Sequence, residues 1–197
     1  MTLQPVTLPG NHVQLVPLDP DHHDGLCDAV RDGELWRLWF TRVPAPEAMA
    51  DEIQRRLGLQ EHGSMLPFTI MVGNEVAGMT TYCNIDTPNK VLEVGYTFIA
   101  RRFQGSHVNP EMKLLMLEYA FEALGQNRVE LRTHSMNRHS RSAIEKLGAT
   151  LDGILRRHTI LPNGTVRDTC VYSILDHEWP TVRAGLEFRL QQPPRRR

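Results

Sequence analysis

The sequence contains 197 residues, with 22 lysines and arginines against 23 aspartates and glutamates, so its formal net charge at pH 7 is −1. This length predicts one domain over residues 1–197, because such a chain can bury a substantial core. The near-zero net charge argues against general attraction to nucleic acid or an anionic membrane, and no run of 18 apolar residues predicts a membrane span. The cysteines Cys27, Cys83 and Cys170 are far apart and odd in number, which favours reduced thiols in a cytoplasm over disulfides or a metal site.

The first half of the chain is expected to form a strand, two helices and a β-hairpin. The hairpin is predicted from Gly73-Asn74, a turn dipeptide between two apolar runs. The second helix is predicted from Met49, Ile53 and Leu57, whose spacing suits one helix face. The expected elements are a strand over 13–18, a helix over 21–32, a helix that begins at Pro44, and strands over 68–72 and 75–82.

The second half adds a central strand–helix–strand unit and a further hairpin. The expected elements are strands over 91–99, 128–134, 151–161 and 166–175, and helices over 109–125 and 138–147 and from Glu178 onward. The order of all these elements predicts an α/β fold in which a mixed sheet carries helices on both faces.

The C-terminal segment leaves two points open. Its apolar side chains pack either on the protein's own sheet or on a second subunit, so a homodimer is possible; these residues are Trp179, Val182, Leu186 and Leu190. The basic residues Arg195–Arg197 follow Pro193-Pro194, and we read about 193–197 as a disordered, solvated tail.

A strand–loop–helix segment in the middle of the chain says most about function. The strand-like run over 91–99 leads into a basic loop that contains Gly105. Asn109, Pro110 and Glu111 then have the residue types expected at the N-cap, the first position and the first turn of a helix. Free backbone N–H groups and the helix dipole at such a start bind phosphate. The segment therefore predicts a site for a phosphorylated ligand.

This loop matches neither common nucleotide fingerprint, because the sequence has no G-x-x-x-x-G-K-[ST] and no G-x-G. Its pattern, Arg102-x-x-Gly105-x-His107, resembles the R/Q-x-x-G-x-G/A signature of the GCN5-related N-acetyltransferases (GNAT). In that family the loop wraps around the pyrophosphate of acetyl-coenzyme A. His107 departs from the signature, so either its Cβ crowds the phosphate or the backbone there needs no glycine.

The resemblance continues over nearly the entire chain. The blocks Leu124-Gly-x-x-Arg-Val-Glu-Leu131 and Asn137-x-x-Ser140-x-x-Ala143-Ile-x-x-Leu-Gly-Ala149 look like the branch typified by the ribosomal-protein N-terminal acetyltransferases (RimJ/RimL-like). It implies a mostly antiparallel sheet with a V-shaped opening between two central parallel strands, and acetyl-coenzyme A as co-substrate without a metal. The candidate coenzyme-binding residues are Gly95, Tyr96, Thr97, Arg101, Arg102, Phe103, Gln104, Gly105, Ser106, His107, Val108, Lys113, Asn137 and Ser140. Arg102 either pairs with phosphate or is a solvated loop arginine, and Lys113 either meets the 3′-phosphate of the coenzyme or solvates the helix.

Glu93 is the candidate general base, since acetyl transfer to an amine requires a neutral amine. Strand alternation puts Glu93 on the face of Gly95 and Thr97, with Tyr96 and Phe98 on the other. Gly95 within a strand indicates a bulge or a close approach by a ligand. The alternative is that Glu93 is a half-exposed strand residue with a structural partner.

Asn137 is a candidate for contacting the coenzyme, and Ser140 is the candidate general acid for its departing thiolate. Asn137 precedes a predicted helix and suits an N-cap, while the resemblance implies a hydrogen bond to the pantetheine arm; the two roles are compatible. In many family members a tyrosine seven residues after this asparagine protonates the thiolate. In this sequence that position is Ile144, which cannot donate a proton. Ser140 resembles the serine that takes this role in the ribosomal-protein branch, and it is otherwise a capping hydroxyl.

The sequence predicts an N-acetyltransferase in which the amine attacks acetyl-coenzyme A directly, with a protein N-terminus as one acceptor. A longer acyl group or a small amine as acceptor is the first alternative, and a non-catalytic coenzyme-sensing module is the second. Trp36, Trp39 and Phe40 either form an acceptor wall or pack in the core. His134, among other polar residues near strand ends, receives no role.

Overall fold

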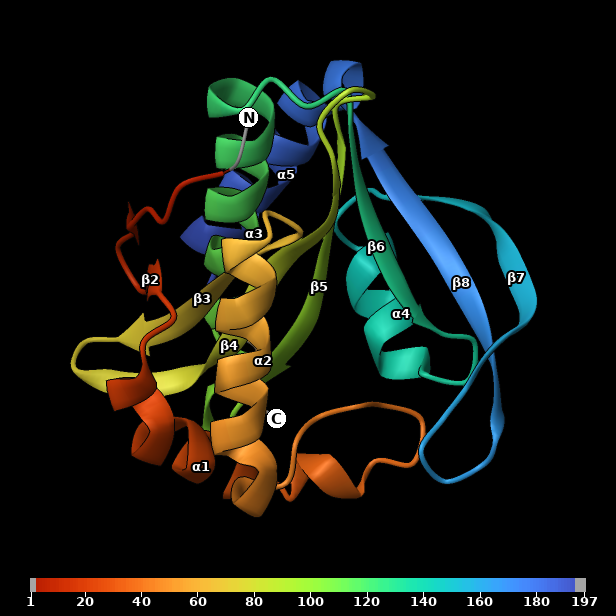
Figure 1. The fold of residues 1–197 in the computed structure, drawn as a ribbon. Helices are drawn as coiled ribbons and strands as arrows, with labels where there is room; N and C mark the ends of the chain where they lie inside the picture. Colours follow the sequence, from red (N-terminus) through yellow and green to blue (C-terminus); the bar gives the residue numbers. More distant parts are fainter. Residues whose placement is uncertain (1–2, 194–197) are drawn as a thin grey trace.

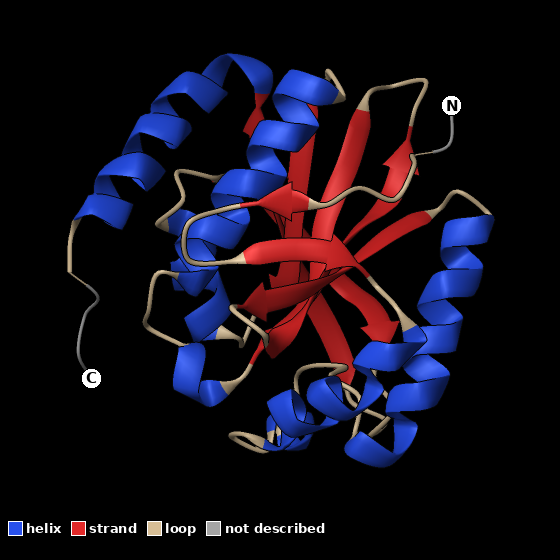
Figure 2. Ribbon diagram, turned by 90° about the vertical axis from the view of Figure 1, so that its left-hand side faces the viewer, coloured by secondary structure: helices blue, strands red, loops and turns tan. Residues whose placement is uncertain are grey.

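The computed structural model describes residues 3–193, in which one eight-stranded sheet carries helices on both faces (Figures 1 and 2). Four residues of the expected tail, 194–197, lie outside the described part. The strands are β1 (Leu8–Pro9), β2 (Gln14–Pro17), β3 (Met65–Val72), β4 (Glu75–Asp86), β5 (Val91–Ile99), β6 (Arg128–His134), β7 (Thr150–Ile160) and β8 (Val166–Leu175). The α-helices are α1 (His23–Arg31), α2 (Met49–Glu61), α3 (Val108–Glu118), α4 (Arg138–Glu145) and α5 (Trp179–Gln191).

The strand order is β1-β2-β3-β4-β5-β6-β8-β7, and all neighbours are antiparallel except β5 and β6. The expected mixed, mostly antiparallel sheet is therefore confirmed. The helices and strands appear in the predicted chain order, apart from the two-residue strand β1, which has no sequence signal. The β3–β4 hairpin turns at Gly73, whose φ of 58° lies in the left-handed region that favours glycine.

Two apolar clusters pack against the sheet, one on each face. One joins Leu92 and Val94 of β5 to Met112 and Met116 of α3 and to Leu186 of α5. The other joins residues of α1 and α2, such as Leu26 and Ile53, to Met79 of β4 and Phe98 of β5. The C-terminal helix α5 thus buries Trp179, Val182 and Leu186 within this chain, whereas Phe188 is 62% exposed. Trp179 stacks on Phe121 at 5.6 Å between ring centroids.

The start of α3 corrects one prediction. The helix begins at Val108 and its N-cap residue is His107, so Asn109 is not the N-cap. Burial of the Val108 side chain draws this residue into the helix, two positions before Pro110. Glu111 is also turned inward, and its carboxylate accepts hydrogen bonds from the backbone N–H groups of residues 11–13 at 2.6–2.9 Å.

Candidate active site

The two parallel strands part at the centre of the sheet. β5 pairs with β6 only between Val91–Glu93 and Arg128–Glu130, although β5 continues to Ile99 and β6 to His134. Figure 1 shows the two strands meeting at one end and diverging toward the other. This is the V-shaped opening that the sequence resemblance implies, and Glu93 stands where the strands separate.

A bulge interrupts β5 directly after the last paired residues. Thr81 of β4 pairs with Gly95, while Met79 pairs with Phe98, so one extra residue of β5 is left unpaired. Tyr96 takes up the irregularity with a φ of 49°. The bulge predicted from Gly95 is therefore present, and its strained residue is the one that follows.

The bulge also corrects the faces predicted for the end of β5. The sequence places Thr97 beside Glu93 and places Tyr96 and Phe98 on the opposite face. In the structure, the Thr97 Oγ1 lies 2.8 Å from the Thr80 Oγ1 on the α3 side, and Phe98 packs with α1. Tyr96 is 45% exposed. One extra residue shifts the period-two alternation, so every side chain beyond it changes face.

Glu93 is buried at the mouth of the opening, on the face that carries α1 and α2. Asn84 Nδ2 donates to its Oε2 at 2.7 Å, and Arg132 Nε lies 3.5 Å from the same oxygen. Burial raises the pKa of Glu93 above its ordinary 4.5, against the opposing effects of the Asn84 hydrogen bond and the Arg132 charge. A carboxylate whose pKa is shifted toward neutrality is a better proton acceptor at physiological pH.

Gly95 keeps the space beside Glu93 open. A Cβ at this position would lie 2.9 Å from Glu93 Oε1 and 3.4 Å from Cys83 Sγ. Burial, together with the nearby Glu93 carboxylate, raises the pKa of Cys83 well above its ordinary 9.0. Cys83 therefore stays a neutral thiol, which is a poor nucleophile.

The helix α4 follows β6 at the other side of the opening. Asn137 is its N-cap, and its Oδ1 accepts a hydrogen bond from the Ser140 N–H at 3.0 Å. The capping interpretation is thus observed, and the contact with pantetheine stays a prediction. The Ser140 hydroxyl is half-buried and has no hydrogen-bond partner within residues 3–193. Ile144 is buried in the core.

The predicted phosphate loop, residues 101–108, runs from the end of β5 to the start of α3. Gly105 has a φ of 77°, and Ser106 Oγ accepts from the Val108 N–H at 3.2 Å. Arg102 is held by two carboxylates, with its Nη1 2.9 Å from Asp32 Oδ2 and its Nε 2.8 Å from Glu75 Oε1. The loop is therefore tied to α1 and to the β3–β4 hairpin, and phosphate binding by Arg102 stays a prediction.

The structure also shows the environments of His107, in this loop, and of Lys113, in the first turns of α3. His107 has φ −73° and ψ −11°, so its backbone needs no glycine, and its Nε2 lies 2.8 Å from the carbonyl of Gln192 at the end of α5. Lys113 is buried rather than solvated, and burial lowers its pKa to about 8. Its contact with a 3′-phosphate stays a prediction.

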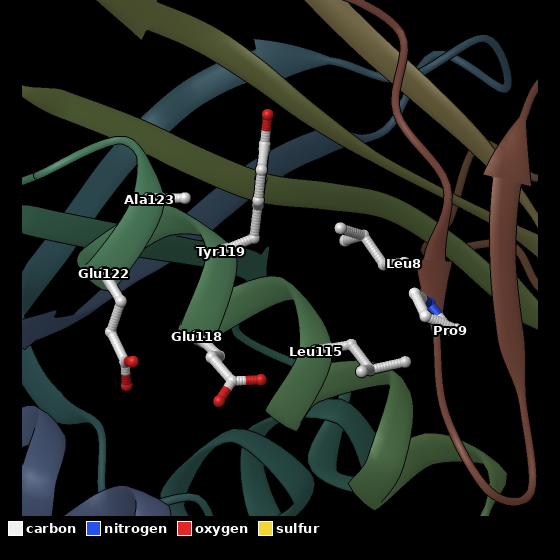
Figure 3. A pocket seen from close by; sticks show the side chains of 7 residues that line it. All are labelled: Leu8, Pro9, Leu115, Glu118, Tyr119, Glu122 and Ala123. Carbon is white, nitrogen blue, oxygen red and sulfur yellow. The ribbon is translucent and has the colours of Figure 1, made fainter.

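A hollow of about 320 Å³ lies elsewhere, between β1 and the outer side of α3 (Figure 3). It is lined by Leu8, Pro9, Leu115, Glu118, Tyr119, Glu122 and Ala123. None of these residues belongs to the group around Glu93, so we do not assign the hollow to the active site. Across residues 3–193, no three His, Cys, Asp or Glu side chains gather as a metal site. In the same residues, no helix has the length and apolar character of a membrane span.

The comparisons with known proteins agree with this geometry. The acetyltransferase (GNAT) domain family matches residues 12–150, which is more than half of the sequence. The chain belongs to the GNAT family. This GNAT domain is 36% identical to a candidate acetyltransferase from T. thermophilus, whose crystal structure matches with a TM-score of 0.86 over 96% of this chain and 100% of that one.

Two further relatives carry ribosomal names. YdaF of Bacillus subtilis (strain 168), named as a candidate ribosomal N-acetyltransferase, is 32% identical over 110 residues. That alignment spans 56% of this GNAT domain and 59% of YdaF's own length. RimL, a ribosomal L7/L12 alpha-N-protein acetyltransferase solved in complex with coenzyme A, is 20% identical with a TM-score of 0.75 over 87% of this chain and 99% of that one. At this identity, RimL shows a shared fold alone.

The structure adds residues that the sequence did not bring to the site. Asn84 and Arg132 are the polar partners of Glu93, and they come from two different strands. The alternation of charged residues along β6 was a visible signal for Arg132, but nothing identified its partner. Trp39 and Phe40 lie beside His134, whereas Trp36 packs against the α1/α2 cluster.

Proposed function

We propose that this GNAT domain transfers the acetyl group of acetyl-coenzyme A to a primary amine by direct attack. The observation that carries the proposal is the position of Glu93, a buried carboxylate with a raised pKa at the point where β5 and β6 separate. The phosphate loop at the start of α3 and the space kept by Gly95 suit the two ends of the coenzyme. Bound acetyl-coenzyme A would supply an activated thioester.

Glu93 takes a proton from the acceptor ammonium, directly or through water, and so frees the lone pair of the nitrogen. The nitrogen then attacks the thioester carbonyl carbon, and a backbone N–H at the Gly95–Thr97 bulge binds the carbonyl oxygen as charge develops there. The carbon–sulfur bond breaks, and the Ser140 hydroxyl gives its proton to the sulfur. The nitrogen, which is positively charged after the attack, loses its second proton, and this proton returns to Ser140 through water. Burial of the Cys83 thiol supports direct attack over a cysteine-bound acetyl group.

A protein N-terminus is the acceptor class that we favour. Support comes from the name of YdaF, and we expect the acceptor contacts to come from the early helices and the variable loops. Two further points also stay predictions: a cytoplasm as the location, in keeping with the free cysteines, and a monomer or homodimer as the working form.

The test combines binding and transfer. Calorimetry with acetyl-coenzyme A and with free coenzyme A should give micromolar dissociation constants, and thiol release should then follow with peptides that carry free N-termini. Glu93→Gln should abolish transfer and retain coenzyme binding, while Glu187→Gln on α5 should match the wild type. Tight binding without transfer to any amine would favour a coenzyme-sensing module, and no binding would reject the proposal.

A further inference from the structure

His134 is a buried polar side chain that the proposed chemistry leaves unused. It ends β6 and is only 4% exposed. Its ring lies edge-on to Trp39 and to Phe40, with 5.4 Å and 6.4 Å between ring centroids. The loop that carries these two aromatics is held in place by Asn163 of the β7–β8 turn, whose Nδ2 donates to the Trp39 carbonyl at 3.0 Å. Histidine and aromatics therefore form a defined box, which we call the aromatic box.

The hydrogen bonds determine which nitrogen of His134 carries the proton. The Met136 N–H donates to Nδ1 at 3.0 Å, so Nδ1 has a free lone pair and a neutral ring holds its proton on Nε2. Burial and the nearby Arg167 cation both lower the pKa of His134, which favours this neutral ring. His134 thus presents an N–H donor inside the aromatic box.

That donor has no partner in the described part of the chain. The Nε2 atom is buried, and no acceptor of residues 3–193 lies within hydrogen-bond distance of it. Buried donors are almost always satisfied in folded proteins, and one left unpaired destabilises the fold. A ligand atom that accepts a hydrogen bond, such as an oxygen, would satisfy this one.

The donor and the candidate base lie within reach of one small group. Glu93 pairs with Glu130, which precedes His134 by four residues on the same face of β6, a separation of about 13 Å. In an α-amino acyl unit the nitrogen and the carbonyl oxygen are about 3 Å apart. Hydrogen bonds at both ends, with one water between the amine and Glu93, add about 9 Å. Such a unit can therefore contact His134 directly and Glu93 through a water.

Arg167 extends the same preference for oxygen. It lies two residues before Thr169, which pairs with His134, and its Nε donates to the Thr169 Oγ1 at 2.9 Å. No carboxylate of residues 3–193 forms an ion pair with Arg167. A half-buried guanidinium with no carboxylate in contact, on which the Glu93 charge acts only from a distance, disfavours a polycationic acceptor such as a polyamine. It favours an acceptor that carries oxygen close to its amine.

We propose that His134 is a specificity-determining residue whose Nε2–H binds the carbonyl oxygen next to the acceptor amine, with the first side chain of the acceptor against Trp39 and Phe40. The acceptor is then an α-amino acyl group, either a peptide N-terminus or a free amino acid. This inference rests on the proposed N-acetyl transfer and names its substrate class. Arg167 would additionally bind the carboxylate in the free amino acid.

The experiment compares acceptors that differ only in the carbonyl. Wild-type protein is first assayed by thiol release with a panel of dipeptide amides and with simple amines. The best dipeptide amide is then compared with the amine that has the same side chain and lacks the carbonyl, and with the free amino acid. His134→Phe removes the donor, His134→Gln keeps an N–H near the Nε2 position, and His177→Phe, at an exposed site before α5, is the matched control.

We expect the wild type to prefer the carbonyl-bearing acceptor by at least about tenfold in kcat/KM, and His134→Phe to lose most of that preference. His134→Gln should retain part of it, and calorimetric affinity for coenzyme A should stay unchanged in all three variants. Greater use of the dipeptide amide assigns the peptide N-terminus, and greater use of the free acid assigns the amino acid. Equal use of the matched pair by the wild type, or equal loss for both acceptors in His134→Phe, would overturn the inference while leaving acetyl transfer intact. No transfer to any amine would instead reject the proposed function, and this inference with it.

Discussion

Arg56 on α2 donates a hydrogen bond from its Nη2 to the carbonyl of Tyr96, the bulge residue of β5, at 3.1 Å. The two residues are 40 positions apart, and the Arg56 side chain is almost completely buried. Its Nε also donates to Glu52 at 2.7 Å, and its guanidinium lies 5.5 Å from the centre of the Tyr96 ring. A helix on one face of the sheet thus holds the irregular backbone at which the acetyl group is expected to bind.

Replacing Arg56 should loosen this bulge. We expect Arg56→Leu to lower the free energy of unfolding by about 2 kcal/mol, because Glu52 and the Tyr96 carbonyl lose a buried partner. Arg55→Leu is the matched control, since Arg55 also contacts Glu52 and the Tyr96 ring but is more exposed; its cost should stay below about 1 kcal/mol. Urea unfolding measures both, and equal losses would mean that the buried hydrogen bond contributes nothing special.

Gly95→Ala should impair catalysis more than coenzyme binding. The new Cβ would lie 2.9 Å from Glu93 Oε1, so the carboxylate must move away from its present position. We expect kcat to fall by roughly tenfold, which is less than the ~10²–10⁴-fold that general base catalysis supplies, with a smaller loss of affinity for coenzyme A. Gly153→Ala in β7 is the control, because a Cβ added there would meet no atom within 4 Å. Wild-type turnover in Gly95→Ala would show that Glu93 tolerates the shift.

The pH dependence of transfer should report Glu93. Burial raises the pKa of Glu93, and a base works only when deprotonated, so kcat/KM should rise with pH through a midpoint above 4.5. The Asn84 hydrogen bond lowers this pKa, and its removal in Asn84→Gly should move the midpoint to higher pH. Glycine suits the φ of 49° at this position, which limits backbone strain. If the midpoint does not move in Asn84→Gly, the pH dependence arises from a group other than Glu93.

Lys113 should make stability depend on pH in the alkaline range. Burial lowers its pKa from 10.5 to about 8, so between these values the unfolded chain binds more protons and the fold gains stability as pH rises. Lys113→Met should lack this gain and be more stable than the wild type at pH 7, by on the order of 1–3 kcal/mol. The difference should shrink toward pH 10.5. Denaturant unfolding at several pH values measures this, with Lys146→Met at an exposed lysine as the control. A stability difference between wild type and Lys113→Met that is the same at every pH would contradict the prediction.

Ser140→Ala should slow the chemical step without disturbing α4. The cap of this helix uses the Ser140 backbone N–H, which the substitution leaves in place. We expect kcat to fall by up to about 10²-fold, because the departing sulfur loses its proton donor. Ser142→Ala, one half-turn further along α4, should turn over at the wild-type rate. Full activity in Ser140→Ala would assign the proton to water or another group.

Local sequence signals were sufficient for most of the fold. Gly73-Asn74 predicted the β3–β4 hairpin, and the alternation around Val129 and Leu131 predicted β6, because turn geometry and strand alternation depend on neighbouring residues. The loop around Gly105 also lies between β5 and α3 as predicted, and its binding of phosphate stays a prediction. The N-cap of α3 lies two residues earlier than predicted, at His107, since packing of Val108 outweighed the local preference of Asn109 for the cap.

The arrangement around the opening required the tertiary structure. The bulge at Tyr96 changes the faces of Thr97 and Phe98, and its backbone accepts a hydrogen bond from Arg56 of another element. The donor of His134 becomes significant only because a distant loop buries it beside Trp39. By itself, the sequence determined the element order, the family resemblance and the candidate base, which rest on short-range patterns. The tertiary structure decided the partners, burial and exposure of these groups, because those depend on contacts between residues far apart in the chain.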